Sequence, residues 1–141
     1  MIIKQLSVFL ENKTGRINEV TSVLGNAGIN LSAFSMAENA EFGILRVIVS
    51  DPDKAYKLLK DNHFGVTLTE VVCLNCPNTP GALSKALHYL SEAGVFIEYM
   101  YAFSSGDVAH VVIRPNDINM CIDILRKHSL ELMAAHQLYQ L

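Results

Sequence analysis

Apolar and polar positions alternate along the first residues of the chain and then change to a helical spacing. The stretch Ile2–Leu10 places apolar side chains at every second position of one face, which predicts a strand. Apolar residues then recur with helical periodicity over Arg16–Asn26, which predicts an amphipathic helix. Thr14 is the expected N-cap of this helix, and Gly28 is expected to end it in the left-handed conformation.

The pattern continues with two strands joined by a polar turn, followed by a second helix. Strands are expected over Ile29–Met36 and Gly43–Ser50, with a hairpin turn over Ala37–Gly43. Asp51 is the expected cap of the second helix, and Pro52 stands in its first turn, where proline is tolerated. Large aliphatic side chains occupy both faces of Gly43–Ser50, so this strand is expected to be covered on both faces.

A repeat dominates the rest of the chain. The segment CPNTPGALSKALHYLSEAGVFI, residues 76–97, follows the same plan as LENKTGRINEVTSVLGNAGINL, residues 10–31, at an offset of 66 positions. Matching at one fixed offset is the signature of a duplicated structural unit. The clearest matches are Asn12 with Asn78, Gly15 with Gly81, Leu24 with Leu90, and Gly28 with Gly94.

The second copy predicts the same elements as the first. Each copy reads β-α-β-β-α-β, so the predicted fold class is α+β, with two ferredoxin-like repeats that have antiparallel sheets and lie side by side. The elements expected in the second copy are a helix over Leu83–Ala93 capped by Thr79, strands over Val95–Phe103 and Val108–Arg114, a helix capped by Asp117, and a final strand over Leu132–Tyr139.

The join between the two copies leaves two arrangements open. We expect a first repeat over residues 1–68 and a second over residues 69–141. The last strand of the first copy, near Val66–Leu74, overlaps the first strand of the second copy, near Thr69–Cys76, and no glycine, proline or turn dipeptide separates them. Either one long strand over residues 66–76 is shared by both repeats, or the C-terminal strand crosses back to complete the first repeat.

The composition narrows the function classes. Half of the 141 residues are apolar and 18% are charged, with a formal net charge of −3. Apolar surface in excess of what two small cores can bury predicts a homo-oligomer, and the absence of a basic stripe argues against nucleic-acid binding. The N-terminal apolar run is too short for a signal peptide or a membrane span, so we expect a cytoplasmic protein without membrane contact.

The residues that could carry metal or catalytic chemistry lack the spacing that such chemistry needs. Cys73 and Cys76 form a C-x-x-C pair, but they fall in a predicted strand, where residues three apart point to opposite faces. We therefore interpret them as structural cysteines and expect no metal, no cofactor and no catalytic residues, that is, no enzyme. The histidines are scattered along the chain: His63, His88, His110, His128 and His136.

Both copies resemble the ACT domain, a small regulatory module that binds amino acids. The resemblance rests on ENKTGRINEVTSVLGNAGINLSAF in the first copy and NCPNTPGALSKALHYLSEAGVFI in the second, each with N-x-x-G between the first strand and the helix. It covers essentially the whole chain. The resemblance implies a non-catalytic regulatory protein that senses an amino acid at the interface between ACT units, with a metabolic enzyme as a candidate partner. The alternative is a purely structural oligomerisation module that regulates a partner enzyme without a ligand.

In the ACT family the ligand lies between the loop before the first helix of one unit and the start of the second strand of another. A helix N-terminus suits a carboxylate, a turn glycine allows close approach, and an asparagine amide offers both a donor and an acceptor. Phe96 stands at the second-copy position that corresponds to Asn30, and a ring cannot replace the hydrogen bonds of an amide. The resemblance implies ligand-binding roles for Asn12, Gly15, Asn30 and Leu31 in the first copy and for Asn78, Pro80 and Gly81 in the second.

Two pairings of these half-sites are consistent with the sequence. The pairing we expect is that of the two copies of one chain, in which the loop from Asn78 to Gly81 faces Asn30. It predicts one amino acid per chain, held by Asn30 and by Asn78 with the Pro80-Gly81 backbone. The other pairing is the alternative. If the first copies of two chains pair, Asn12 and Asn30 cooperate instead. Asn12 and Asn78 also have a purely structural interpretation, because asparagine is favoured in turns without any ligand.

Overall fold

Two compact units make up the chain in the computed structural model, which describes residues 1–39 and 41–141. The first unit consists of Lys4–Thr69 and His136–Leu141, and the second unit consists of Met1–Ile3 and Glu70–Ala135. Strand β4 runs without interruption from Gly65 to Pro77, so its first residues belong to the first unit and the rest to the second. Of the arrangements that the sequence left open, the long shared strand is present, and the C-terminal residues also return to the first unit.

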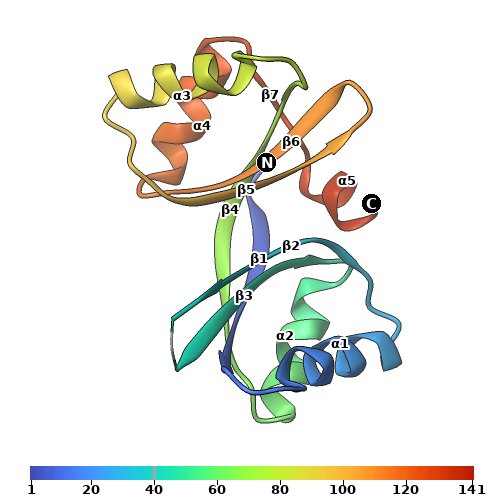
Figure 1. The fold of residues 1–141 in the computed structure, drawn as a ribbon. Helices are drawn as coiled ribbons and strands as arrows, with labels where there is room; N and C mark the ends of the chain where they lie inside the picture. The colour runs from blue at the N-terminus through green and yellow to red at the C-terminus, as the bar shows by residue number, and fades with distance from the viewer. Residues whose placement is uncertain (40) are drawn as a thin grey trace. The chain divides into compact units, whose positions relative to one another are not determined.

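The first unit folds as a strand–helix–strand–strand–helix–strand motif. Its elements are β1 (Ile3–Glu11), α1 (Arg16–Asn26), β2 (Leu31–Glu38), β3 (Phe42–Val49), α2 (Pro52–Asp61) and the first residues of β4. The strand order is β2-β3-β1-β4, with α1 and α2 on one face of the sheet (Figure 1). Strand β3 pairs antiparallel with both neighbours, so that Val47 lies opposite Leu6 on β1 and Phe34 on β2. The predicted turn over Ala37–Gly43 includes Ala40, which lies outside the described residues.

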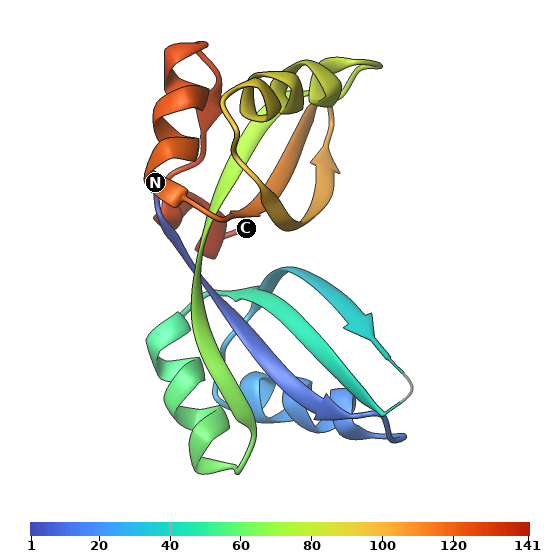
Figure 2. The same ribbon diagram turned by 90° about the vertical axis from the view of Figure 1, so that its left-hand side faces the viewer.

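The second unit repeats this motif. Its elements are the rest of β4, α3 (Ala82–Glu92), β5 (Ile97–Ser105), β6 (Val108–Pro115), α4 (Ile118–Lys127) and β7 (Glu131–Leu132). The strand order is β7-β4-β6-β5, all pairs are antiparallel, and α3 and α4 cover one face (Figure 2). Replacing each strand by its counterpart at the offset of 66 gives the order of the first unit. The predicted ferredoxin-like fold is therefore confirmed in both units.

Equivalent residues fill the two cores. Leu24 of α1 and Leu90 of α3 are both completely buried, each in the core of its own unit. Burial of a leucine side chain contributes about 1.5–3 kcal/mol relative to exposure, so these helices are held mainly by their apolar faces. The strand residues at corresponding core positions are Leu6, Val8 and Leu10 in β1, and Val72, Leu74 and Cys76 in β4.

Glycine, and not threonine, begins the first helix of each unit. Gly15 and Gly81 are the N-cap residues of α1 and α3, with φ angles of 90° and 86° in the left-handed region. The expectation that Thr14 and Thr79 cap these helices is wrong, because no side chain accepts a capping hydrogen bond at either helix. The left-handed glycine turns the chain directly into the helix, which a residue with a Cβ does only with strain.

The second helix of each unit begins as the sequence predicts. The side chain of Asp51 accepts a hydrogen bond from the Lys54 backbone N–H at 3.2 Å, and that of Asp117 accepts one from the Met120 N–H at 3.0 Å. Each bond satisfies a backbone donor that the first helical turn leaves without an intrahelical partner. At the other end of α1, Gly28 has a φ of 74°, which confirms the predicted left-handed stop.

The predicted final strand over Leu132–Tyr139 is wrong. Strand β7 contains only Glu131 and Leu132, which lie opposite Asn75 and Leu74 of β4. Residues Ala135–Tyr139 then form a short helix, α5, in which Leu138 is completely buried. Apolar residues spaced along this stretch fit an alternating strand as well as a short helix, and periodicity alone does not distinguish the two over so few residues.

Candidate functional site

The loop before α1 is tied to the hairpin between β2 and β3. The backbone N–H of Asn12 donates to the Glu41 carbonyl at 3.0 Å, and its side-chain Nδ2 donates to the Asn39 carbonyl at 3.3 Å. Asn39 in turn shapes the hairpin, because its Oδ1 accepts from the backbone N–H groups of Glu41 and Phe42, each at 2.9 Å. The exposed side chain of Asn12 therefore has a structural role in closing two turns against each other.

The corresponding loop of the second unit is built in the same way. The backbone N–H of Asn78 donates to the Asp107 carbonyl at 2.8 Å, and its Nδ2 lies 3.5 Å from the Gly106 carbonyl, the outer limit for a hydrogen bond. A surface groove of about 230 Å³ lies beside this loop, lined in part by Pro77 and Asp107. The structure thus places both predicted asparagines in equivalent positions and gives both the same backbone contact.

The two helix starts leave open space around their glycines. A Cβ added at Gly15 or at Gly81 would meet no heavy atom within 4 Å. Their positive φ angles require glycine whether or not a ligand binds, while the open space would let a ligand approach the backbone. Pro80 lies exposed directly before Gly81. Neither helix start has a side-chain cap, and the first N–H of each helix, that of Arg16 or Ala82, donates to a loop carbonyl at 3.3 Å. The positive end of each helix dipole lies at this open space.

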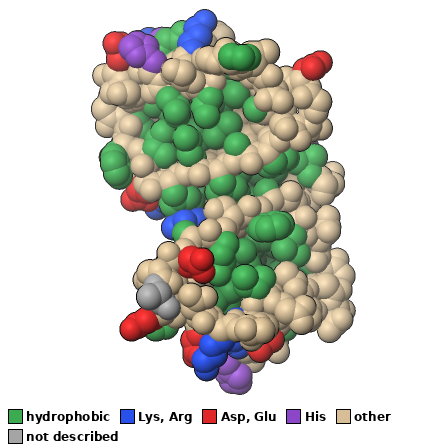
Figure 3. Space-filling view, in the orientation of Figure 1, with side chains coloured by type: hydrophobic (Ala, Val, Ile, Leu, Met, Phe, Trp, Pro, Cys, Tyr) green, Lys and Arg blue, Asp and Glu red, His purple; other side chains and the backbone are tan. Residues whose placement is uncertain are grey.

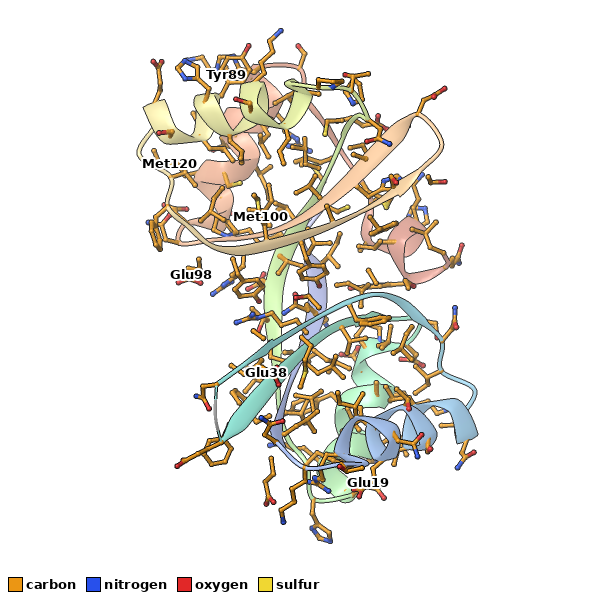
Figure 4. All side chains as sticks on the ribbon, viewed as in Figure 1. Glu19, Glu38, Tyr89, Glu98, Met100 and Met120 are labelled. Carbon is orange, nitrogen blue, oxygen red and sulfur yellow. The ribbon has the colours of Figure 1, made fainter. Side chains whose placement is uncertain are left out.

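Arg16 adds a cation at the start of α1. Its guanidinium lies over the ring of Phe64, 4.7 Å from the ring centroid, and its Nη1 pairs with Glu19, which Figure 4 labels on α1. The Nε of Arg16 is buried and has no hydrogen-bond partner within residues 1–39 and 41–141. Buried polar groups normally have a partner, so this Nε is an exception that a small movement of the Arg16 side chain would have to expose before it could reach a ligand. Ala82 occupies the equivalent position in the second unit.

The start of β2 is fixed by its backbone. The N–H of Asn30 donates to the Ser50 hydroxyl and the Asn30 carbonyl accepts from the Ser50 N–H, both at 2.9 Å. A bulge follows between Leu31 and Ala33. Leu31 packs against the core of the first unit, so its side chain supports the strand, whereas the side chain of Asn30 is exposed. Sequence reasoning did not identify Ser50, whose role depends on the pairing of β2 with β3.

The C-terminal segment, His136–Leu141, covers this strand start. Asn30 Nδ2 donates to the Leu141 carbonyl at 3.3 Å, and Ser32 Oγ donates to the Tyr139 carbonyl at 3.4 Å. The Tyr139 hydroxyl accepts from the backbone N–H of Lys4 at 2.8 Å. All of these residues belong to the first unit, and Figure 1 shows α5 close to the β2 and β3 end of that unit. Ser32 was not predicted as a site residue, since its partner comes from a segment assigned to a strand.

The second unit differs at the equivalent strand start. Phe96 keeps the backbone frame, with its N–H donating to Asn116 Oδ1 at 2.9 Å, but its ring is 66% exposed. A surface groove of about 440 Å³ lies between α3 and β5, lined by apolar residues that include Leu87 and Ile97 as well as Phe96. Figure 3 shows hydrophobic side chains gathered at the surface of this unit. Glu98, which Figure 4 labels on β5, replaces Ser32 and pairs with Arg114 at 3.1 Å.

The structure does not bring Asn12 and Asn30 of the same unit together. Asn12 follows the last residue of β1 and contacts the hairpin that follows β2, whereas Asn30 precedes β2. The eight residues of β2 therefore separate the two sites, a length of about 26 Å at the usual rise of a strand. A ligand that touches both kinds of residue must take the loop from one ACT unit and the strand start from another.

The cysteines are buried thiols in the second unit. Burial raises the pKa of Cys73 to about 12, and burial with the nearby Asp117 carboxylate raises the pKa of Cys121 to about 11. Such thiols are neutral at physiological pH and poor metal ligands or nucleophiles. Within residues 1–39 and 41–141 no three histidine, cysteine or acidic side chains cluster as metal ligands. In the same part of the chain, every helix is too short or too polar to cross a lipid bilayer.

Two solved structures extend the likeness beyond the sequence motifs. The crystal structure of protein BT0572 from Bacteroides thetaiotaomicron is 62% identical over 100% of this chain and 98% of that chain, with a TM-score of 0.97. The ligand-free regulatory subunit of aspartate kinase from Thermus thermophilus is 13% identical, over 88% of this chain and 91% of that chain, with a TM-score of 0.65. At such low identity the second likeness shows the fold alone.

A family model agrees with the duplicated fold. The comparison with curated proteins gives no match. The model described as an ACT domain pair matches residues 1–141, the whole length of the chain. Each unit has the strand order and the glycine-started helix on which the resemblance to ACT domains rests. The chain therefore belongs to the ACT domain pair family.

Proposed function

We propose that this protein is a non-catalytic regulatory module in which ACT units bind an amino acid and thereby change their association with each other or with a partner. One observation carries the proposal. At the start of β2, the side chains of Asn30 and Ser32 donate to carbonyl oxygens of Leu141 and Tyr139. These two donors are held outside the core in an orientation suited to oxygen atoms, such as those of an α-carboxylate.

The other half of the proposed site is the loop before α1. Arg16 has a buried Nε without a partner in the described residues, and Gly15 leaves open space in front of the helix start. Both features favour an anionic group. We therefore infer that the first units of two chains pair, so that Asn12 and Gly15 of one chain face Asn30 and Leu31 of the other. The loop with Asn78, Pro80 and Gly81 is the alternative half-site.

This proposal implies a homodimer and a metabolic partner. When the loop and the strand start both come from first units, each ligand needs the first units of two chains. The working form then has at least two chains, which light scattering at micromolar concentration would detect as at least twice the monomer mass. The regulatory subunit of aspartate kinase, which shares this fold, is an example of such a module with a partner enzyme. We expect such a partner, and this protein, in the cytoplasm.

Thermal-shift screening with the twenty amino acids tests the proposal. A ligand that binds only the folded state stabilises it by about 2.7 kcal/mol at a concentration one hundred times its dissociation constant. This amount raises the melting temperature by several degrees in a chain of this size. If no amino acid changes the melting temperature, the module regulates by assembly alone, and the ligand proposal fails.

Calorimetry on a matched pair of variants identifies the loop that binds. Asn12→Ala and Asn78→Ala remove equivalent exposed amides with equivalent hairpin contacts. We expect Asn12→Ala to weaken binding of the amino acid found in the screen by roughly 10- to 150-fold, because a lost hydrogen bond to a charged group costs about 1.5–3 kcal/mol. We expect Asn78→Ala to leave the binding unchanged. The opposite result would assign the ligand to the loop of the second unit.

A further inference from the structure

The C-terminal segment is anchored firmly at one end of its contact with the first unit. Leu138 is completely buried, and the Tyr139 hydroxyl accepts a hydrogen bond of 2.8 Å from the backbone N–H of Lys4. Removal from water raises the pKa of Tyr139, and the Lys4 N–H hydrogen bond opposes this shift only in part. Tyr139 is thus half-buried, and its hydroxyl is paired. The bond to Lys4 holds Tyr139 on the first unit, directly after the buried Leu138.

The other contacts of the segment are weaker. The bonds from Asn30 to the Leu141 carbonyl and from Ser32 to the Tyr139 carbonyl measure 3.3 and 3.4 Å. Both exceed the usual range for side-chain donors, so each contributes little. Asn30 and Leu141 are exposed, and water competes for this bond. The segment therefore combines a strong anchor with a tip that is easily displaced from Asn30 and Ser32.

We propose that the C-terminal segment is a tethered competitor that occupies the donors of Asn30 and Ser32 until an amino acid displaces it. This inference rests on the proposed function, because it assigns a regulator to the same strand start. The carbonyl groups of Tyr139 and Leu141 take the positions that ligand oxygen atoms would need. A tethered group acts at an effective concentration in the millimolar range, so the segment raises the ligand concentration at which the first unit responds.

The regulation applies to one unit only. The second unit has Phe96 and Glu98 where the first has Asn30 and Ser32, and Glu98 is paired with Arg114. An exposed ring and a carboxylate do not offer the two donors that hold the C-terminal segment. The segment thus sets a threshold at the strand start of the first unit, and the apparent dissociation constant there equals the intrinsic one divided by the fraction of chains with the segment displaced.

Loosening the anchor in the full chain tests the inference. Tyr139→Phe removes the acceptor of the Lys4 N–H and keeps the ring, and Leu138→Ala removes the buried side chain. The matched control is Tyr56→Phe, which deletes a hydroxyl that has no hydrogen bond in the described part of the first unit. Hydrogen exchange of the Lys4 amide without ligand reports the displacement in Leu138→Ala, which keeps the Tyr139 hydroxyl as acceptor, and we expect it to rise there. In Tyr139→Phe the amide loses its acceptor, so we expect exchange to rise roughly fivefold, since one hydrogen bond is lost.

The direction of the change in ligand affinity decides the outcome. Calorimetry with each of the twenty amino acids should give tighter binding to Tyr139→Phe than to wild type, by up to about fivefold, and no change for Tyr56→Phe. Equal or weaker binding to both loosened variants, with binding to wild type intact, overturns the competitor and leaves the proposed function standing. No binding to wild type or to either variant overturns both. An unchanged exchange rate at Lys4 in both variants also overturns the competitor, because the anchor would then not hold the segment.

Discussion

The two units share a frame and differ in the chemistry placed on it. Both begin their first helix at a left-handed glycine, cap their second helix with aspartate, and bury a leucine at the same position of the first helix. At the start of the second strand, however, the first unit has the amide of Asn30 under the C-terminal segment, and the second has the exposed ring of Phe96 beside an open groove. The frame depends on backbone geometry and core packing, whereas the exposed positions are free to differ.

The largest expected effect tests whether the two cores are energetically equivalent. Leu24→Ala and Leu90→Ala each remove a completely buried side chain, and we expect each to lower the free energy of unfolding by about 2–5 kcal/mol. Urea unfolding gives the size of the loss, and hydrogen-exchange mass spectrometry gives its location. Exchange should rise in the first unit for Leu24→Ala and in the second for Leu90→Ala. A rise in exchange across both units with either variant would show that the two cores do not unfold independently.

Alkaline pH should affect the stability of the second unit through its thiols, since all three cysteines lie in that unit. The pKa of Cys73 is raised to about 12, so its stabilising contribution is complete below its unfolded pKa, about 9, and is lost as the pH rises towards 12. We expect the free energy of unfolding of wild type, relative to Cys73→Ala, to fall by about 1.4 kcal/mol for each pH unit above 9. Urea unfolding at several pH values measures this slope.

The control for this slope is Ser7→Ala. Ser7 occupies the position in β1 that corresponds to Cys73 in β4, and its hydroxyl bonds to Gln5 and Thr69. The stability difference between wild type and this variant should not depend on pH over the same range. A slope in the control as large as that for Cys73→Ala would assign the alkaline effect to another group.

The smallest expected effect tests whether the two glycine-started helices are equivalent. Gly15→Ala and Gly81→Ala meet no atoms within 4 Å, so their cost comes from the positive φ alone, and we expect a loss of about 1–2 kcal/mol for each. Gly25→Ala in α1 also meets no atoms and has no positive φ, and should stabilise by about 0.5–1 kcal/mol. Thermal unfolding measures all three. A clearly larger loss at one helix start would show that its surroundings are not equivalent.

Most of the fold could be predicted because the duplication repeats the sequence signals for the ends of helices and strands. Glycines, aspartate caps and apolar spacing recur at one offset, and each agrees with the local structure that forms. The final element could not be predicted, because Glu131 and Leu132 already complete the sheet and the next residues fold as a helix around Leu138. The threonine caps also failed, since a left-handed glycine one residue after Thr14 and two residues after Thr79 takes the N-cap position.

The candidate site was predictable in its positions and not in its contacts. Asn12, Asn30 and Asn78 lie at the predicted turns and strand start, yet their hydrogen-bond partners come from hairpins or from the C-terminal segment. The bond from Asn30 to Leu141 joins residues 111 positions apart. Such a partner follows from the path of the chain end, which the apolar pattern did not reveal. The unsatisfied Nε of Arg16 likewise depends on its stacking over Phe64.

The membership of the C-terminal segment in the first unit has a consequence for synthesis on the ribosome. Residues 4–69 emerge before residues 70–135 of the second unit, but residues 136–141 emerge after them. At roughly 5–20 residues per second, several seconds separate the two events. During that interval the nascent first unit has its sheet and helices but not Leu138, and Asn30 and Ser32 stay uncovered. The half of the protein that is translated first is therefore completed last.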